Sequence, residues 1–283
     1  MAVGCVGEKV KVYETATLKP KAELTKKAFV AAFSADSKSL LVADLNGTPH
    51  WQDVKTLATR PVPGYEGNIH RVEAVAVSPD RRTAALGLPE GTIQILEIET
   101  GKPLVPPLNG HEGPVRSLAF SPSGDVLASG GSDNYVKLWD VKTRQCLGAC
   151  SEHKGNVFGV TISPDGKTLA SGCGAETIKF WNTANVKTGA VVSLSYHKSV
   201  IRTLAYSPDG KTLASGSEDK TVRLWNVALH AEVARLKQDA PVRLVVFSPD
   251  GRTLATVTDS GAVRIFRAVG IGEMEDDARN QMR

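Results

Sequence analysis

Short apolar segments separated by polar turns run through the whole chain. In one stretch the segments Val115–Phe120, Val126–Ser129 and Tyr135–Trp139 alternate with turns. Segments of this length are typical of β-strands, and no stretch has helical spacing long enough to compete with them. Pairs such as Asp165-Gly166 lie between two segments, where a tight hairpin needs the positive φ that glycine accepts. The pattern therefore predicts antiparallel meanders.

One block of ten residues occurs twice without a change. Residues 163–172 and 207–216 both read Ser-Pro-Asp-Gly-Lys-Thr-Leu-Ala-Ser-Gly, and successive copies start 41 to 44 residues apart. Weaker copies begin at Ser34, Ser78, Ser121 and Ser248. A fourth strand, such as the one expected at 145–150, completes each unit. A period of about 40 to 45 residues with four strands is that of a β-propeller, in which each unit forms one blade.

Three short motifs connect these units with a known family. The pair Gly110-His111, the block Leu127–Gly130 and the ending Leu138–Asp140 match the WD-repeat signature. The chain therefore resembles the WD-repeat β-propeller family, and the resemblance covers almost all of it. The near-identical Ser-Pro-Asp-Gly-Lys-Thr units are similar to bacterial WD repeats, which in that family are often fused to protein kinase or other signalling domains.

The resemblance implies a set of hydrogen bonds inside each blade, which we call the lock. It joins a His, a Ser, an Asp and a Trp, whose buried polar groups supply one another with partners. Two units match at all four positions: His111, Ser129, Asp133 and Trp139, and His197, Ser215, Asp219 and Trp225. Another unit has three of the four residues: His153, Ser171 and Trp181. Ala175 stands at its aspartate position, and we expect all these residues to be structural.

Other units depart further from the lock. The last unit has Phe266 in place of Trp and Thr256 in place of Ser, and the third has Leu96 at the Trp position. In the second unit the alignment puts Gln52 at that position, so that Trp51 is displaced by one residue onto the opposite face of its strand. This tryptophan either packs against a neighbouring blade or contacts a ligand.

The expected fold is an all-β, seven-bladed WD-repeat propeller with six complete blades and an incomplete first one. The blade boundaries are 1–25 (partial), 26–63, 64–109, 110–151, 152–195, 196–236 and 237–272, followed by a polar tail at 273–283. The first blade lacks its innermost strand, and a strand at Ala268–Gly272 could extend the last. Since an open ring leaves unpaired strand edges, we expect a C-terminal part of a longer protein or a shortened reading frame.

The sequence contains few features that would indicate an enzyme. It contains no Gly-x-Ser-x-Gly elbow, no paired-histidine metal motif and no glycine-rich phosphate loop. Gly166-Lys167-Thr168 imitates the end of such a loop, but Thr161 stands where the first glycine is required. The four cysteines form no metal-ligand pattern with the histidines, and Cys146 and Cys150 are too far apart along one strand for a disulfide. We expect no catalytic residue, no cofactor and no metal.

Charge and hydropathy narrow the choice of partner. The net charge is +4, from 34 basic and 30 acidic residues that are not bunched, so nucleic acid is disfavoured. No run approaches the roughly 20 apolar residues of a membrane helix, and the first residues do not resemble a secretion signal. The chain is therefore expected in the cytoplasm, with no membrane partner.

In WD-repeat proteins, the residue just inside the first strand of each blade rims one face of the central channel, where peptides often dock. The aligned residues here form a candidate peptide-binding rim: Phe29, Glu73, Arg116, Phe158, Arg202 and Arg243. Three arginines and two phenylalanines would suit an acidic or phosphorylated peptide with an apolar anchor. Alternatively, each arginine pairs with a nearby carboxylate, such as Glu73 or Asp219, and only solvates the rim.

Three classes of function follow. The first is a non-catalytic scaffold that binds peptides or proteins on a propeller face. The second is the sensing or docking part of a larger signalling protein, such as a protein kinase fusion. A propeller enzyme ranks last, because the rim holds mainly Arg and Phe.

Overall fold

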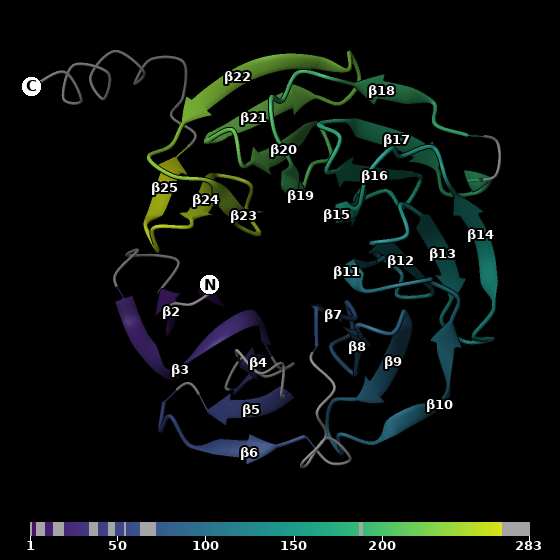
Figure 1. The fold of residues 1–283 in the computed structure, drawn as a ribbon. Coiled ribbons are helices and arrows are strands. Elements are labelled where there is room, and N and C mark those ends of the chain that lie inside the picture. The colour runs from purple at the N-terminus through teal and green to yellow at the C-terminus, as the bar shows by residue number, and fades with distance from the viewer. Residues whose placement is uncertain are drawn as a thin grey trace, which may run out of the picture.

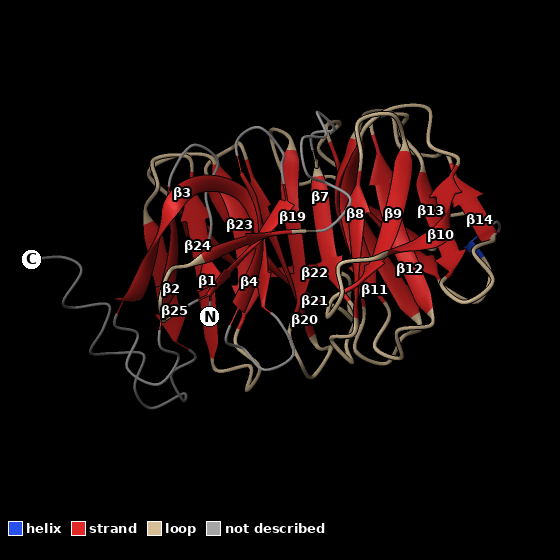
Figure 2. Ribbon diagram, turned by 90° about the horizontal axis from the view of Figure 1, so that it is seen from below, coloured by secondary structure: helices blue, strands red, loops and turns tan. Residues whose placement is uncertain are grey.

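The computed structural model of the chain is a ring of β-sheets around a central opening (Figure 1). It describes residues 2–3, 9–13, 20–33, 39–44, 49–53, 55–62, 72–186 and 189–267. The strands of this part form six antiparallel sheets, which stand side by side and run between the two faces of the ring (Figure 2). The tail 273–283 and the expected strand Ala268–Gly272 lie outside the described residues.

Each sheet follows the chain order. The first contains β1 (Ala2–Val3), β2 (Lys9–Tyr13), β3 (Pro20–Phe33), β4 (Ser39–Asp44), β5 (Pro49–Asp53) and β6 (Thr59–Pro61). The second contains β7 (Ala74–Val77), β8 (Thr83–Gly87), β9 (Thr92–Glu97) and β10 (Pro103–Asn109). The third contains β11 (Val115–Phe120), β12 (Val126–Gly131), β13 (Val136–Asp140) and β14 (Cys146–Cys150).

The remaining sheets repeat this plan. The fourth contains β15 (Val157–Ile162), β16 (Thr168–Cys173), β17 (Ile178–Asn182) and β18 (Val192–Leu194). The fifth contains β19 (Ile201–Tyr206), β20 (Thr212–Ser217), β21 (Thr221–Asn226) and β22 (Ala231–Lys237). The sixth contains β23 (Val242–Phe247), β24 (Thr253–Thr258) and β25 (Val263–Arg267). In the second to sixth sheets, the first strand lies nearest the central opening in Figure 1: β7, β11, β15, β19 and β23.

The N-terminal region differs from the expected arrangement. The partial first blade is not a separate sheet, because β3 runs without interruption from Pro20 to Phe33. Its first part pairs with β2, as in Lys9 with Lys27, and its second part pairs with β4 from Ala28 onward. Pro20 stands only at its start and no glycine follows within the strand, so no turn separates the two halves. The described residues therefore form six blades.

Glycines allow neighbouring sheets to approach closely. A Cβ at Gly130 would lie 2.6 Å from Cγ1 of Val157, the first residue of the next inner strand. The same contact recurs one sheet further on, where a Cβ at Gly172 would lie 2.6 Å from Cγ2 of Ile201. The repeated Ala-Ser-Gly segment thus combines a lock serine with the site of blade-to-blade packing.

The core lies between the sheets. Trp139 of the third sheet packs against Ile93 and Ile95 of the second, and Trp181 packs in the same way against the third sheet. Trp51 faces the other way, toward Leu86 and the rest of the second sheet. The pairing of Leu40 with Gln52 confirms the expected displacement of this tryptophan. Its buried ring therefore belongs to the packing between blades.

Candidate functional site

The rim positions share one backbone feature. Arg116, Phe158, Arg202 and Arg243 are each the second residue of an inner strand. At each of them the register with the neighbouring strand shifts, as it does at Phe29 in β3. Such a bulge leaves one residue unpaired and redirects its side chain. Glu73 directly precedes β7, and the side chain of Phe29 lies outside the described part.

Arg116 is held between two sheets. Its Nε donates to Oγ of Ser132 at 2.8 Å, and its Nη1 donates to Oε2 of Glu73 in the second sheet, also at 2.8 Å. The arginine side chain is 31% exposed and the glutamate side chain 14%. A pair at this depth connects adjacent blades while one side of the guanidinium stays in contact with solvent.

Arg202 and Phe158 form a second link between blades. The guanidinium carbon lies 4.2 Å from the centre of the Phe158 ring, within the range of a cation–π contact. Nε of Arg202 also donates to Oε1 of Glu218 at 2.8 Å. Arg202, which Glu218 fixes in place, thus covers one face of the Phe158 ring.

Arg243 completes the series. Its Nε and Nη2 bind both carboxylate oxygens of Asp259, the second at 2.8 Å, and its Nη1 lies 3.6 Å from Oε1 of Glu218. Glu218 therefore contacts arginines of two successive sheets. Each of the three arginines faces a carboxylate, so the six formal charges of these side chains cancel.

The structure thus places Glu73 beside Arg116, as the alternative interpretation expected, while Asp219 belongs to a lock. The sequence reasoning missed Ser132, Glu218 and Asp259. Each follows its arginine by 16 residues, the distance from the start of an inner strand to the turn after the next strand. This repeated spacing was a signal that could have identified them.

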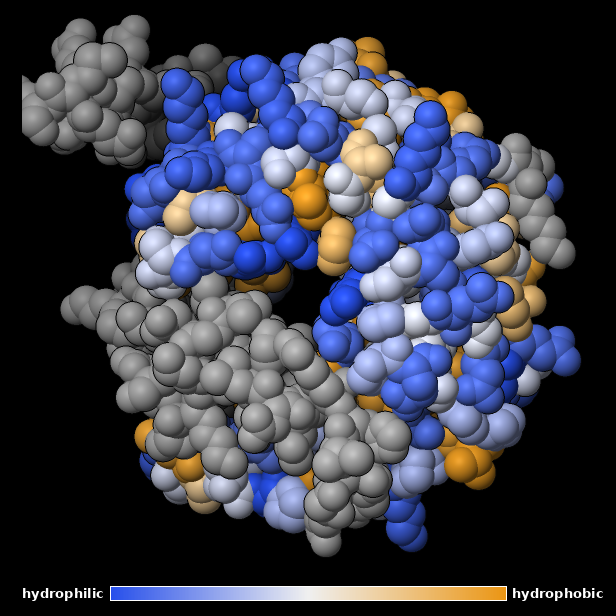
Figure 3. All heavy atoms as spheres, in the orientation of Figure 1, coloured by the Kyte–Doolittle hydropathy of each residue, from blue (hydrophilic) through white to orange (hydrophobic). Residues whose placement is uncertain are grey.

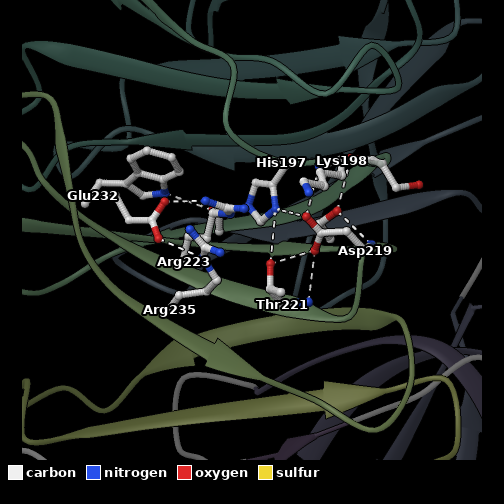
Figure 4. Close-up of polar contacts among 11 residues, drawn as sticks. His197, Lys198, Asp219, Thr221, Arg223, Glu232 and Arg235 are labelled. Atoms are coloured by element: carbon white, nitrogen blue, oxygen red, sulfur yellow. Dashed lines mark hydrogen bonds and ion pairs between the residues drawn. The ribbon is translucent and has the colours of Figure 1, made fainter.

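The locks of the third and fifth sheets have the same geometry. In the fifth, Nε2 of His197 lies 2.7 Å from Oγ of Ser215, which accepts from the indole Nε1 of Trp225 at 2.9 Å. Nδ1 of His197 lies 2.8 Å from Oδ2 of Asp219, as Figure 4 shows. In the third sheet the corresponding distances are 2.7, 2.8 and 2.9 Å.

The hydrogen bonds define the proton positions. The serine oxygen accepts from the indole N–H, and among the described contacts its own hydroxyl proton has no acceptor other than Nε2 of the histidine, to which it donates. Nδ1 then carries the remaining proton and donates it to the aspartate. Burial lowers the pKa of His111 more than its contact with Asp133 raises it, so the imidazole is neutral. For Asp219, burial raises the pKa, but hydrogen bonds led by that of His197 outweigh this and hold the pKa well below its usual range.

The fourth sheet holds the shortened lock. Nε2 of His153 lies 2.7 Å from Oγ of Ser171, which accepts from Nε1 of Trp181 at 2.7 Å. Ala175 offers no acceptor at the aspartate position, and Nδ1 of His153 is buried without a partner among the described residues. Burial lowers the pKa of His153 to about 4.

The other described side chains include free cysteines but no cluster of potential metal ligands. Within the ranges described, no three His, Cys, Asp or Glu residues gather as metal ligands do. Cys146, Cys150 and Cys173 are free thiols, and burial raises the pKa of Cys150 to about 11. A helix of the length and hydropathy needed to cross a membrane is not found among the described residues.

Most sheets of the ring have four strands, and three of them hold a His–Ser–Trp lock; together these features define a WD-repeat β-propeller. The family described as WD domain, G-beta repeat, matches residues 102–140, 144–182, 189–226 and 232–267, together more than half of the chain. The chain therefore belongs to the WD40 family. Proteins with such propellers generally act as interaction scaffolds, and they are typically non-catalytic.

Curated relatives share parts of the chain. It is 36% identical over 111 residues to the WD repeat-containing protein SL1-17 of Schistosoma mansoni, covering 39% of the chain and 36% of the relative. The Periodic tryptophan protein 2 homolog of Neurospora crassa is 41% identical over 71 residues, 25% of the chain and 8% of the relative. The COMPASS component SWD1 of Saccharomyces cerevisiae is 35% identical over 74 residues, 25% of the chain and 17% of the relative.

The matched part of this chain spans about a third of the first of these relatives and less of the other two. All three organisms are eukaryotes, so the bacterial type of repeat expected from the sequence stays a prediction.

Proposed function

We propose that this chain is a non-catalytic scaffold that binds a peptide segment of a partner protein at the rim. The observation that carries the proposal is the arrangement of Phe158, Arg202 and Glu218, in which an aromatic ring, a fixed guanidinium and a carboxylate lie next to one another. Bulges redirect the side chains of Phe158 and Arg202, and the ion pair with Glu218 holds Arg202 in place before a ligand arrives. Such preorganisation reduces the entropy cost of binding.

The rim favours a segment with an acidic or phosphorylated residue. Arg116 and Arg202 each make two described hydrogen bonds, and the guanidinium fork has more donors than these bonds use. A phosphate, with its larger charge, competes with Glu218 better than a single carboxylate does. The proposed ligand is therefore a peptide with a phosphorylated or acidic residue next to an apolar one.

The same face would serve a free-standing scaffold and the docking part of a larger signalling protein. The name of one relative, COMPASS component SWD1, describes a component of an assembly, which suits either role. We also propose a cytoplasmic location, which the three free thiols support because reducing compartments keep cysteines unpaired.

The surface seen in Figure 3 is mostly hydrophilic over the second to sixth sheets, as suits a polar peptide.

The test uses peptides selected from a library with a central phosphoserine or glutamate, and measures their dissociation constants. Replacing Arg116, Arg202 and Arg243 together by Gln is expected to weaken binding by about tenfold or more. The matched control replaces Lys167, Lys211 and Arg252 by Gln. These exposed side chains lie in turns at the opposite ends of the inner strands, and the change in net charge is the same.

A second variant is expected to strengthen peptide binding instead of weakening it. Glu218→Gln removes a carboxylate that contacts both Arg202 and Arg243, so acidic peptides are expected to bind more tightly. Equal losses in the rim and control variants, or a weaker affinity for Glu218→Gln, contradict the proposal.

A further inference from the structure

Comparison of the three locks reveals a set of hydrogen-bond donors without an acceptor. In the fifth sheet the Asp219 carboxylate accepts from Nδ1 of His197, from the Lys198 N–H at 3.0 Å, and from both the N–H and the hydroxyl of Thr221, at 2.9 and 2.6 Å. Figure 4 shows them converging on this carboxylate. In the third sheet Asp133 accepts from His111 Nδ1, from the Glu112 N–H at 3.0 Å and from the Tyr135 N–H at 3.2 Å.

The fourth sheet keeps the corresponding donors. We call them the donor triad: Nδ1 of His153 and the backbone N–H groups of Lys154 and Thr177. Because Nε2 of His153 bonds to Ser171 as in the other locks, Nδ1 points toward the Ala175 position. His153 is only 4% exposed, and its Nδ1 has no partner among the described residues. The two N–H groups also make no hydrogen bond within the described chain.

The chemistry of the site selects an anion. The shared proton arrangement makes Nδ1 of His153 a donor, and the other two members of the triad are donors as well. An acceptor that satisfies all three at once must offer two oxygens in one plane, as the carboxylates of Asp133 and Asp219 do. An unsatisfied buried donor costs about 1–3 kcal/mol, which favours any group that supplies this acceptor.

The triad lies close to the rim. A Cβ at Gly174 would lie 3.6 Å from Cε2 of Phe158, and one at Gly155 would lie 3.1 Å from the Ala175 nitrogen. The small residues Gly155, Gly174 and Ala175 therefore lie together beside Phe158, and Ala175 itself is partly exposed. Access to the triad from outside therefore passes Ala175, beside the Phe158 ring.

We propose that the donor triad binds a carboxylate supplied from outside the chain, the side chain of an aspartate or glutamate in a bound peptide. The carboxylate takes the position that Asp133 and Asp219 occupy in their own sheets and completes the fourth lock. That the triad binds a small carboxylate follows from the lock geometry alone. That a peptide supplies this carboxylate rests on the proposed function.

The experiment uses the whole chain labelled with nitrogen-15 and formate as the probe. Formate, added at constant ionic strength against chloride, is expected to shift the signals of His153 Nδ1 and of the Lys154 and Thr177 amides together. It is also expected to raise the pKa of His153 by about one unit, because a negative charge favours the imidazolium.

Two variants provide matched controls. Ala175→Asp supplies the acceptor within the chain and is expected to abolish the response to formate. Asp133→Ala removes the acceptor of the third sheet and is expected to create a second response, at His111, Glu112 and Tyr135. A wild-type chain that responds to chloride and formate alike, a chain that does not respond, or a response that persists in Ala175→Asp overturns the proposal.

The outcome is separable from that of the proposed function. Formate binding without any loss of peptide affinity in the rim arginine variant supports the carboxylate site and contradicts the peptide scaffold. Peptide binding that depends on the rim arginines, without a response to formate, supports the peptide scaffold and contradicts the carboxylate site.

Discussion

Ser171 accepts a hydrogen bond of 2.7 Å from the indole Nε1 of Trp181, although its lock has no aspartate. The distance is nearly that between Ser129 and Trp139, at 2.8 Å, in a complete lock. The Ser–Trp bond therefore forms without the aspartate. The role left to the carboxylate is to satisfy Nδ1 of the histidine and two backbone N–H groups.

Removal of that carboxylate should destabilise a complete lock. Asp133→Ala leaves Nδ1 of His111 and the N–H groups of Glu112 and Tyr135 without their acceptor. We expect the free energy of unfolding to fall by about 2 kcal/mol in urea titrations. Asp125→Ala, at an exposed position, is the control and should change it by less than about 0.5 kcal/mol. Equal effects of the two substitutions would show that the lock adds no stability.

The reverse change, which adds a carboxylate to the shortened lock by Ala175→Asp, should stabilise the fourth sheet. It should also alter how the stability of the chain depends on pH. The folded-state pKa of His153, about 4, lies below the unfolded value of about 6.5. Between these values the unfolded chain binds a proton that the folded chain does not, so stability falls as the pH decreases through this window. Burial is the main cause of the lowered pKa, the charge of Lys179 adds to it, and Glu152 opposes it.

Ala175→Asp adds an acceptor that stabilises the imidazolium and raises the folded-state pKa of His153. We expect the free energy of unfolding to rise by about 1 kcal/mol at pH 7 and to fall less steeply between pH 6.5 and 4. Chemical denaturation at several pH values measures both effects. The same slope in both proteins would contradict this account.

Tyr206 carries a buried hydroxyl without a described partner. Burial raises the pKa of this phenol well above its usual value. Phe120 and Phe247 occupy the same register position in their sheets, each paired with a leucine as Tyr206 is. Tyr206→Phe should therefore leave stability unchanged or increase it by up to about 1 kcal/mol, as thermal unfolding can show. The reciprocal Phe120→Tyr should be destabilising, and a stable variant would refute the argument.

The glycine contacts between blades predict a steric effect. A methyl group at Gly172 would lie 2.6 Å from Cγ2 and 3.1 Å from Cβ of Ile201, a stiff β-branched side chain of the next inner strand. Gly172→Ala is expected to lower the free energy of unfolding by about 1–3 kcal/mol. Gly174→Ala meets only ordinary contacts and serves as the control in the same denaturation series. A harmless Gly172→Ala would mean that the sheets can move apart without cost.

Much of the fold could be predicted because each repeat carries its own turn and strand signals. The block at 163–172 is enough to place two strands, a hairpin and a lock serine, and its period places the blades. The alignment also placed Gln52, rather than Trp51, at the Trp position of the second repeat, as the pairing of Gln52 with Leu40 confirms. The continuity of β3 was missed, because the joining of two half-strands depends on pairing with two different neighbours rather than on local pattern.

The alignment selected the candidate rim arginines, and Glu73 was expected as a carboxylate partner, but Ser132, Glu218 and Asp259 were missed. Arg116 contacts Glu73 from the preceding repeat, and Glu218 contacts arginines of two sheets. Such contacts arise from the spacing between blades, which a single repeat does not contain. The donor triad was missed for a related reason, since Ala175 was read only as a departure from the lock.

The most direct test of the central claim is to locate a bound peptide on the ring. A selected peptide with an acidic or phosphorylated residue and a photoreactive group is crosslinked to the chain, and the crosslinked residues are identified by mass spectrometry. The account predicts crosslinks at Phe158, Arg202 and the turn around Glu218. Crosslinks confined to the outer strands or to the Ser-Pro-Asp-Gly turns at the opposite face would contradict it.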